Sequence, residues 1–274
     1  MTDLRYLPSA PAFSVQHLLE VCEEAGRLAL DLRRRGLRVQ SKQDGSPVTN
    51  ADLALSELLE SRLLALSPTF PVLCEETLVL PDSDTFWILD PLDGTRELMA
   101  GRDAFTINIA LIQNGSVVAG LIYHPVTDRA WWGGPHWGAF DRNGALAFGQ
   151  GTGATVLVSP REPPALLEQW RRQLAATNKV CFERVPGAMK YPLLVSGHAI
   201  AHARTAVCSA WDVAAGQALV EGAGGVVTTY EGGALRYHRE LGAMTGWQVN
   251  GLLAGRRDMV ALLQRTDTRE LGSR

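Results

Sequence analysis

Residues 86–95 read Phe86-Trp87-Ile88-Leu89-Asp90-Pro91-Leu92-Asp93-Gly94-Thr95 and place two carboxylates directly after an apolar run. The apolar residues predict a buried strand that ends where the two aspartates begin. Because a proline cannot continue a hydrogen-bonded ladder, we expect the chain to leave the sheet at Pro91. Magnesium prefers oxygen ligands and keeps several waters, so one or two carboxylates plus phosphate oxygens make a typical site. The stretch therefore predicts a corner that holds a divalent cation bridged to a phosphate.

The residues that follow the aspartates suit the same chemistry. Gly94 permits close approach of the backbone to a ligand, and Thr95 can cap a helix over residues 96–99. Such a helix start leaves free amide donors for a phosphate oxygen, and the Leu92 carbonyl can face the same ion. An ordinary turn capped by an aspartate explains the string equally well. Further acids must converge on it before the metal interpretation is preferred.

Composition excludes several classes of partner. With 274 residues, of which 46% are hydrophobic and 20% charged, the chain can bury an extensive core or form two lobes. Its formal net charge of -3 provides no footprint for a nucleic-acid polymer or an anionic membrane. No apolar stretch is long enough to span a bilayer, so we expect a cytoplasmic protein. The four cysteines lie too far apart for a zinc knuckle or a redox pair.

The first half reads as an α+β lobe over residues 1–150. Apolar residues at helical spacing predict amphipathic helices over residues 14–35 and 51–66, separated by a polar loop at 41–47. Alternating apolar residues predict strands that pair as an antiparallel sheet behind the two helices, at residues 72–74, 86–90, 106–113, 116–124 and 130–133. Asn114-Gly115 and Arg142-Asn143-Gly144 are hairpin signals.

The second half, residues 151–274, reads as an α/β lobe that completes the site, so that the two lobes form one functional unit. Helices are expected at residues 164–174, 189–195 and 210–223, and strands at 156–158, 179–182, 203–207, 226–230 and 252–254. The Gly-rich residues 148–153 are the candidate boundary between the lobes. Residues 266–274 read as a frayed tail.

Three further acidic features lie at the ends of predicted elements, where sites are usually built. Asp52 opens the second helix, Glu75-Glu76 end a strand, and Asp212 opens the helix at residues 210–223. Each has a simpler explanation, since an acid near a helix N-terminus interacts favourably with the helix dipole and Ser209 to Asp212 resembles a capping box. Convergence with Asp90 and Asp93 would make them parts of one site.

Three blocks in this order resemble the inositol monophosphatase superfamily of magnesium-dependent, lithium-sensitive phosphatases. The blocks are Glu75-Glu76, Asp90 to Thr95, and Trp211-Asp212-Val213-Ala214-Ala215-Gly216. The resemblance implies a layered α+β or α/β sandwich (αβαβα) of the inositol monophosphatase and fructose-1,6-bisphosphatase type, with the site between two lobes. It also implies a phosphoric monoester hydrolase that uses Mg2+, with two or three ions per site.

The resemblance implies five metal ligands, the last through its carbonyl: Glu75, Asp90, Asp93, Asp212 and Leu92. Metals held there would bridge the phosphate and lower the pKa of a bound water, which provides a nucleophile near neutral pH. Glu75 and Thr95 would orient that water, and Asp52 would pair with the Thr95 hydroxyl. The amides of Gly94 and Thr95, beside Asp93, would hold the phosphate.

The catalytic blocks do not identify the substrate, because superfamily members hydrolyse inositol monophosphates, adenosine 3',5'-bisphosphate, fructose 1,6-bisphosphate or histidinol phosphate. Three details resemble the bisphosphate nucleotidase branch typified by CysQ: the continuation Thr95-Arg96-Glu97-Leu98, and the positions of Lys190 and Arg204. Two cations near the pocket suit a ligand with a second phosphate, since charge-assisted contacts are the stronger ones. We therefore expect a 3'(2'),5'-bisphosphate nucleotidase that acts on a small phosphorylated metabolite.

Other interpretations stay open at this point. Residues 186–190 lack both serines of the matching nucleotidase segment, and residues 246–254 are more similar to an inositol-phosphatase ending. An inositol-1-monophosphatase or another sugar-phosphate phosphatase is the alternative, with Lys190 and Arg204 then as solvated surface residues. A non-catalytic sensor of an anionic metabolite is the rival from another class. The sequence does not decide whether the protein forms a homodimer.

Overall fold

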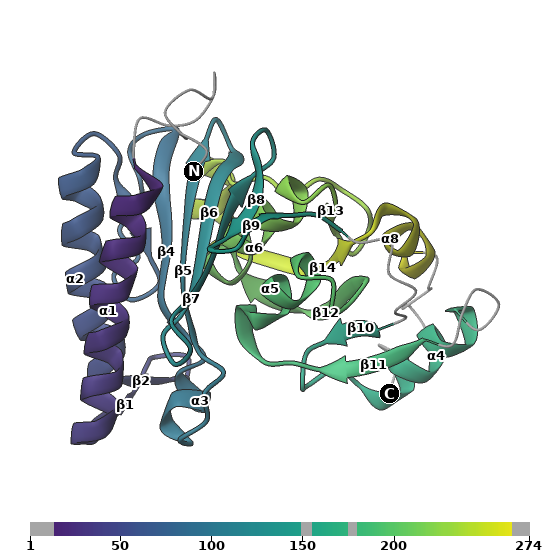
Figure 1. The fold of residues 1–274 in the computed structure, drawn as a ribbon, viewed down its shortest axis with the longest axis horizontal. Helices are drawn as coiled ribbons and strands as arrows, with labels where there is room; N and C mark the ends of the chain where they lie inside the picture. Colours follow the sequence, from purple (N-terminus) through teal and green to yellow (C-terminus); the bar gives the residue numbers. More distant parts are fainter. Residues whose placement is uncertain (1–13, 149–154, 175–179, 265–274) are drawn as a thin grey trace.

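Five layers alternate between helices and sheets in this protein, as expected from the sequence (Figure 1). The structure is a computed structural model that describes residues 14–148, 155–174 and 180–264. Three separate hydrophobic cores lie between successive layers. None of the helices within these ranges has the length and apolar character of a membrane span.

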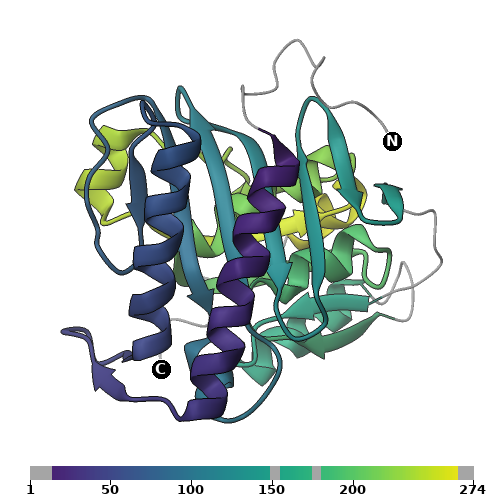
Figure 2. The same cartoon turned by 60° about the vertical axis from the view of Figure 1, so that its left-hand side comes forward.

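Two helices form the first layer, α1 (Val15–Arg35) and α2 (Asn50–Leu66), and they cover one face of the first sheet (Figure 2). Helix α1 turns its predicted apolar stripe inward, with Leu18, Cys22 and Ala29 buried against the sheet. The helix ends at Gly36, which adopts the positive φ of 97° that favours glycine. These boundaries agree with the predicted helices to within a residue.

The prediction of a plain polar loop between these helices was incomplete. A hairpin of β1 (Val39–Ser41) and β2 (Pro47–Thr49) stands there. Its turn is closed by two backbone bonds, from Lys42 N to Ser46 O at 2.8 Å and from Gly45 N to Lys42 O at 3.0 Å. Each strand has only three residues, and those of β1 are all exposed, so the hairpin carries little of the periodic apolar signal on which strand prediction depends.

The first sheet has seven strands in chain order. They are β3 (Val72–Cys74), β4 (Thr85–Asp93), β5 (Thr106–Gln113), β6 (Ser116–His124), β7 (Arg129–Gly134), β8 (Gly138–Asp141) and β9 (Gly144–Leu146). The pairing is antiparallel as predicted except that β3 runs parallel to β4. Asn114 and Gly115 both have positive φ, 50° and 72°, as the predicted two-residue hairpin turn requires.

Strand β4 does not end at Pro91, contrary to the prediction. Asp90 pairs with Asn108 and Asp93 pairs with Thr106, so two residues of β4 face one residue of β5 between these pairs. This is a β-bulge, a position at which a sheet tolerates proline. Because Thr106 and Asn108 are two apart on a regular strand, they share a face. The bulge therefore brings Asp90 and Asp93 to the same face, although they are three residues apart.

The second half supplies the remaining layers. Helix α6 (Ala210–Gly222) lies with α5 (Lys190–Val195) between the two sheets (Figure 1). The second sheet has the order β11-β10-β12-β14-β13, with bounds β10 (Thr155–Val158), β11 (Cys181–Arg184), β12 (Ala201–Ser209), β13 (Val226–Thr229) and β14 (Gln248–Gly255). The outer face carries α4 (Pro164–Leu174) and α8 (Arg257–Leu263). Shorter helices are α3 (Thr95–Met99), η2 (Gly187–Met189) and α7 (Arg239–Thr245).

Helix α6 approaches the first sheet closely because both surfaces are built from small residues. A Cβ on Gly120 of β6 would lie 2.6 Å from the carbonyl oxygen of Ala215 and 2.7 Å from Cβ of Ala218. The start of α6 is thereby held against the sheet that contains β4. This packing explains how a residue of the second half can reach a site that the first half begins.

The predicted division into lobes at residue 150 stays a prediction. Residues 149–154 and the expected tail at 266–274 lie outside the described residues. The first sheet uses residues 72–146 and the second uses residues 155–255. The helices α7 and α8 were not predicted, and neither were the bounds of β8 and β9, although Arg142-Asn143-Gly144 had predicted the hairpin that joins these two strands.

Candidate functional site

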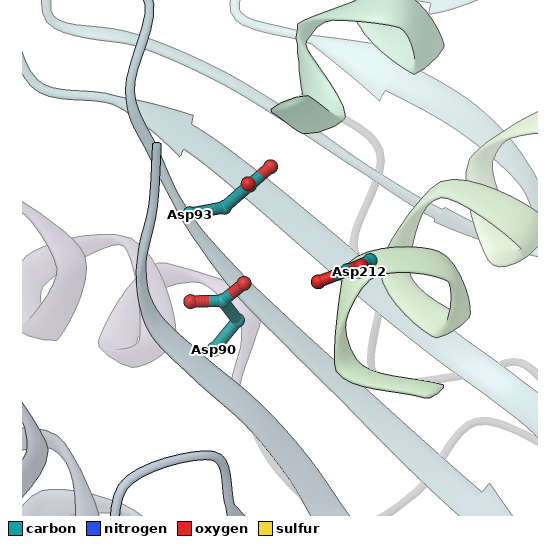
Figure 3. A group of neighbouring side chains, drawn as sticks. All are labelled: Asp90, Asp93 and Asp212. Atoms are coloured by element: carbon teal, nitrogen blue, oxygen red, sulfur yellow. The ribbon is translucent and has the colours of Figure 1, made fainter. Parts of the chain in front are cut away.

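Three aspartates from the two halves of the chain meet between the sheets. Asp90 and Asp93 come from the bulged end of β4, and Asp212 comes from the first turn of α6. One carboxylate oxygen of each lies within 4.8 Å of the others, and the three side chains point toward one another (Figure 3). The structure thus brings together three of the predicted metal ligands.

Asp212 has both of the roles that the sequence allowed. Its Oδ2 accepts a 3.2 Å hydrogen bond from the backbone N–H of Ser209, the residue that precedes α6. This capping contact satisfies a helix N-terminus and fixes the side chain. The same carboxylate faces Asp90 and Asp93. The capping box therefore positions Asp212 in the site and does not replace that role.

The three carboxylates are costly to ionise together. Burial, followed by the charge of Asp93, raises the pKa of Asp212 to about 7. Burial, followed by the charge of Glu75, raises the pKa of Asp90 well above its ordinary value. Burial also raises the pKa of Asp93, although Lys190 and Arg204 oppose this shift. A cation in the cluster would favour the charged forms that burial and, for Asp90 and Asp212, neighbouring carboxylates disfavour.

The donor set fits a hard divalent cation. Asp90 Oδ1 accepts a 3.0 Å hydrogen bond from the Leu92 N–H. Its Oδ2 is buried and has no hydrogen-bond partner among the described residues. A buried charged oxygen without a partner is expensive, and an all-oxygen carboxylate set is what magnesium prefers. These residues therefore fit the metal that the resemblance implies.

Glu75 lies close enough to raise the pKa of Asp90, but it pairs with a cation of the protein. Its Oε1 lies 2.6 Å from Nζ of Lys42, which is also 2.9 Å from Oε1 of Glu76. Burial raises the pKa of Glu75, and Lys42 opposes that shift. Glu75 therefore lies within electrostatic range of the aspartates but outside the group of three carboxylates that meet, and Lys42 balances its charge.

Lys42 was not among the site residues predicted from the sequence. It lies in the turn of the β1–β2 hairpin, far from the acidic motifs in the chain. The composition of the chain offers a signal for Lys42, because lysine is rare: of the 26 lysine and arginine residues, the lysines are only those at positions 42, 179 and 190. Both of the lysines that the structure describes contact the site region.

Asp52 pairs with Thr95, as the resemblance implied. The Thr95 hydroxyl donates to Asp52 Oδ1 at 2.7 Å, and Asp52 Oδ2 accepts from the N–H and the hydroxyl of Thr49 at 2.8 and 2.5 Å. The buried Asp52 thus caps α2 and fixes the Thr95 hydroxyl. Thr95 itself is not the cap of its helix, contrary to the prediction.

Gly94 is the residue that precedes α3, and its φ is 102°. Side chains rarely adopt this conformation, and a Cβ there would lie 2.8 Å from the Ala104 carbonyl oxygen. A glycine is therefore required where the chain turns from β4 into α3.

Lys190 is buried and is not a solvated surface residue. Its ammonium group donates to the carbonyls of Val185 at 3.1 Å and Gly187 at 2.5 Å. Burial lowers the pKa of Lys190 to about 8, although the charge of Asp93 opposes this shift. The neighbouring Ala188 N–H donates to Asp93. The segment of residues 187–190 therefore contacts the acidic cluster through the Ala188 N–H.

Arg204 is partly exposed on β12. Its guanidinium donates to the carbonyl oxygens of Ala206 at 3.2 Å and Val207 at 2.9 Å. The positive charge of Arg204 lowers the pKa values of Asp93 and Asp212. The structure thus places both predicted substrate-binding cations near the aspartates.

Comparison with known proteins identifies the family. The chain matches the inositol monophosphatase family over residues 14–261. It is 28% identical over 234 residues to a 3'(2'),5'-bisphosphate nucleotidase CysQ of Buchnera aphidicola, covering 80% of this chain and 86% of that one. It is 32% identical over 206 residues to the CysQ of Escherichia coli K12, covering 73% and 82%. The crystal structure of the extragenic suppressor protein SuhB from Bartonella henselae superposes with a TM-score of 0.75 at 25% identity, covering 93% and 98%.

The chain belongs to the inositol monophosphatase family. It is a phosphoric monoester hydrolase, a phosphatase with the layered fold of that family.

Proposed function

We propose that this member of the inositol monophosphatase family releases the 3'-phosphate of adenosine 3',5'-bisphosphate in a magnesium-dependent reaction, giving AMP and phosphate. The observation that carries the proposal is the pair of cations, Lys190 and Arg204, beside the cluster of Asp90, Asp93 and Asp212. The CysQ nucleotidases among its relatives support the same substrate. A small cytoplasmic metabolite as substrate is part of this proposal.

The residues that would hold two or three magnesium ions are Glu75, Asp90, Asp93 and Asp212, with the carbonyl of Leu92. When bound, magnesium supplies charge neutralisation for the phosphate oxygens and lowers the pKa of a water molecule. The buried Oδ2 of Asp90, which has no hydrogen-bond partner in the described part of the chain, supports this assignment. So does the raised pKa of each of the three aspartates, because burial disfavours their charged forms and a bound cation would favour them.

Thr95 and Glu75 would orient the attacking water. The Thr95 hydroxyl donates a hydrogen bond to Asp52, so its lone pairs are left to accept a hydrogen bond from water. Glu75 has a raised pKa and a partner, Lys42, that can balance its charge. A carboxylate with these properties suits transfer of a proton from the water as it attacks phosphorus. The amides of Gly94 and Thr95 would bind the phosphate.

The second phosphate of the substrate would interact with Lys190 and Arg204. Charge-assisted hydrogen bonds to a phosphate are roughly twice as strong as neutral ones. A substrate with a single phosphate would leave both cations without that partner. The proposal therefore predicts that the 5'-phosphate lowers the KM.

An inositol-1-monophosphatase or another sugar-phosphate phosphatase is the second candidate. The donors of Lys190 and Arg204 are already partly satisfied by four backbone carbonyls, those of Val185, Gly187, Ala206 and Val207. This arrangement favours cations that stabilise the fold of their own segments. It is compatible with a ligand that has one phosphate.

Phosphate release at a fixed magnesium concentration decides between these candidates. Adenosine 3',5'-bisphosphate, inositol 1-phosphate and fructose 1,6-bisphosphate would be compared by kcat/KM. We expect the nucleotide to be the preferred substrate, and a clear preference for either sugar phosphate would overturn the nucleotidase proposal. Repeating the assay with millimolar-range lithium tests the inhibition that the family resemblance implies.

A further inference from the structure

Arg204 stands at the edge of a bulge in β12. Arg204 pairs with Leu252 of β14 and Val207 pairs with Asn250. Between these pairs, Thr205 and Ala206 face the single residue Gly251, so β12 carries one extra residue. Gly251 has a φ of 68°, and a Cβ there would lie 2.9 Å from the Arg204 carbonyl oxygen. The bulge and its facing glycine are thus matched to each other.

A buried carboxylate from outside the sheet holds this bulge. Glu162 is 2% exposed. One of its oxygens accepts a 3.0 Å hydrogen bond from the Thr205 N–H, and the other accepts a 2.8 Å hydrogen bond from the Thr205 hydroxyl. A bulge leaves its extra residue without a ladder partner, and the carboxylate supplies an acceptor for that N–H. Both oxygens of Glu162 are therefore used at one residue.

Glu162 is itself held by a rigid turn. Its N–H donates to the Ser159 carbonyl at 3.1 Å. Its carbonyl accepts a 2.8 Å hydrogen bond from Arg184, which also donates to the carbonyls of Ser159 and Pro160. The ion pairs among the described residues include none with Glu162. A buried carboxylate that is not paired with a cation destabilises the fold, so the presence of Glu162 here calls for a specific role. Its two hydrogen bonds to Thr205 indicate that role.

We propose that Glu162 is a positioning residue for substrate selection, which sets the place of the Arg204 guanidinium by fixing the bulge at Thr205. The guanidinium donates to the carbonyls of Ala206, which lies in the bulge, and Val207, which directly follows it. Displacement of the bulge therefore displaces the guanidinium relative to Asp93 and Asp212. The inference rests on the proposed function in one respect, that Arg204 binds the phosphate that is not cleaved.

The test separates binding of that second phosphate from catalysis. The KM and kcat of the magnesium-loaded enzyme would be measured for adenosine 3',5'-bisphosphate and for 3'-AMP, which lacks the 5'-phosphate. Glu162→Gln turns one acceptor into a donor, and Thr205→Val removes the hydroxyl. We expect each variant to raise the KM for the bisphosphate roughly ten-fold, as substitutions of residues that hold a binding side chain in place do. The kcat and the KM for 3'-AMP should stay close to the wild-type values.

Three controls separate positioning from a general loss of structure. Thr205→Ser keeps both donors and should restore the wild-type KM. Glu183→Gln, at a carboxylate on β11 whose side chain is 45% exposed, should have no effect. Adding Glu162→Gln to Arg204→Met should raise the KM no further, because the carboxylate acts through the arginine.

The outcomes distinguish this inference from the proposed function. If the wild type prefers fructose 1,6-bisphosphate, the nucleotidase proposal is wrong, and the same variants are then measured on that sugar and on fructose 1-phosphate, which lacks the 6-phosphate. A loss of discrimination between either pair supports the role of Glu162. An equal rise in KM for both members of a pair, a fall in kcat alone, or a wild type that ignores the second phosphate overturns it.

Discussion

The hydroxyl of Thr95 donates a 2.7 Å hydrogen bond to Asp52, which lies 43 residues earlier in the chain. Asp52 is buried in the first turn of α2, where it also accepts two hydrogen bonds from Thr49. A helix cap in the outer layer therefore determines the orientation of a hydroxyl at the site. Because this hydroxyl donates to Asp52, it faces the site as an acceptor.

Thr95→Val should lower kcat about 100-fold, since it removes the hydrogen-bond acceptor that orients the attacking water. Valine is similar in shape to threonine, so the fold should persist. Thr95→Ser keeps the hydroxyl and should stay within a few-fold of the wild type. Phosphate release with a thermal melt of each variant is the measurement. A Thr95→Val enzyme with wild-type kcat would exclude the role given to this hydroxyl.

Asp93→Asn should lower kcat/KM at least about 100-fold, because a neutral amide is a poor ligand for magnesium. The metal-free protein should melt no lower than the wild type. Burial already raises the pKa of Asp93, so removing its charge relieves a cost of folding. Asp82→Asn, at an exposed position between β3 and β4, is the matched control. Retention of activity in Asp93→Asn would mean that the acidic cluster does not hold the metal.

Lys42→Met should tighten magnesium binding several-fold and raise the KM for the phosphate ester. The variant removes a positive charge 2.6 Å from Glu75, so the site becomes more negative. Titration calorimetry with magnesium and steady-state kinetics measure the two effects. Lys42→Arg keeps the charge and serves as the control. Weaker magnesium binding in Lys42→Met would show that Lys42 supports the metal site.

The metal-free protein should lose stability between about pH 4 and pH 7. The pKa of Asp212 is about 7 in the folded protein and about 3.9 in an unfolded chain. The folded state therefore binds more protons in this range, and the free energy of unfolding falls as pH rises, on the order of 1 kcal/mol per pKa unit. Above pH 7 the loss is complete. Asp90, whose pKa is also raised, acts in the same direction.

Urea denaturation in a chelator at pH 5 and pH 8 tests this trend. Asp212→Asn should flatten it, because the asparagine has no titrating proton to lose as the pH rises. Millimolar magnesium should stabilise the protein more at pH 8 than at pH 5, since metal binds the deprotonated ligands. A chelated protein that is more stable at pH 8 would contradict the raised pKa values.

Most helices and strands of the core were predictable, because each is encoded by the spacing of its own apolar residues. The predicted bounds of α1, α2, α4 and α6 agree with the structure to within a residue or two at each end. The helices α7 and α8 were not predicted, and the hairpin β1–β2 was predicted only as a polar loop. These elements are short or exposed, and they owe their place to the surface on which they pack.

The acidic residues of the candidate site could be predicted for a different reason than the helices and strands. Asp52, Glu75, Asp90, Asp93 and Asp212 could be named because family blocks occur in a fixed order in the chain. Lys42 and Glu162 could not, since each lies in a segment without such a block. Their partners, Glu75 and Thr205, are 33 and 43 residues away.

The sequence by itself determined the layered fold, the family and the set of acids, because apolar periodicity and motif order are local properties of the chain. Only the tertiary structure decided that a bulge at Pro91 turns Asp90 and Asp93 to one face, and that close packing of α6 brings Asp212 to them. It also decided which cations balance them. Such contacts depend on the approach of backbones far apart in the chain, which no local pattern of residues encodes.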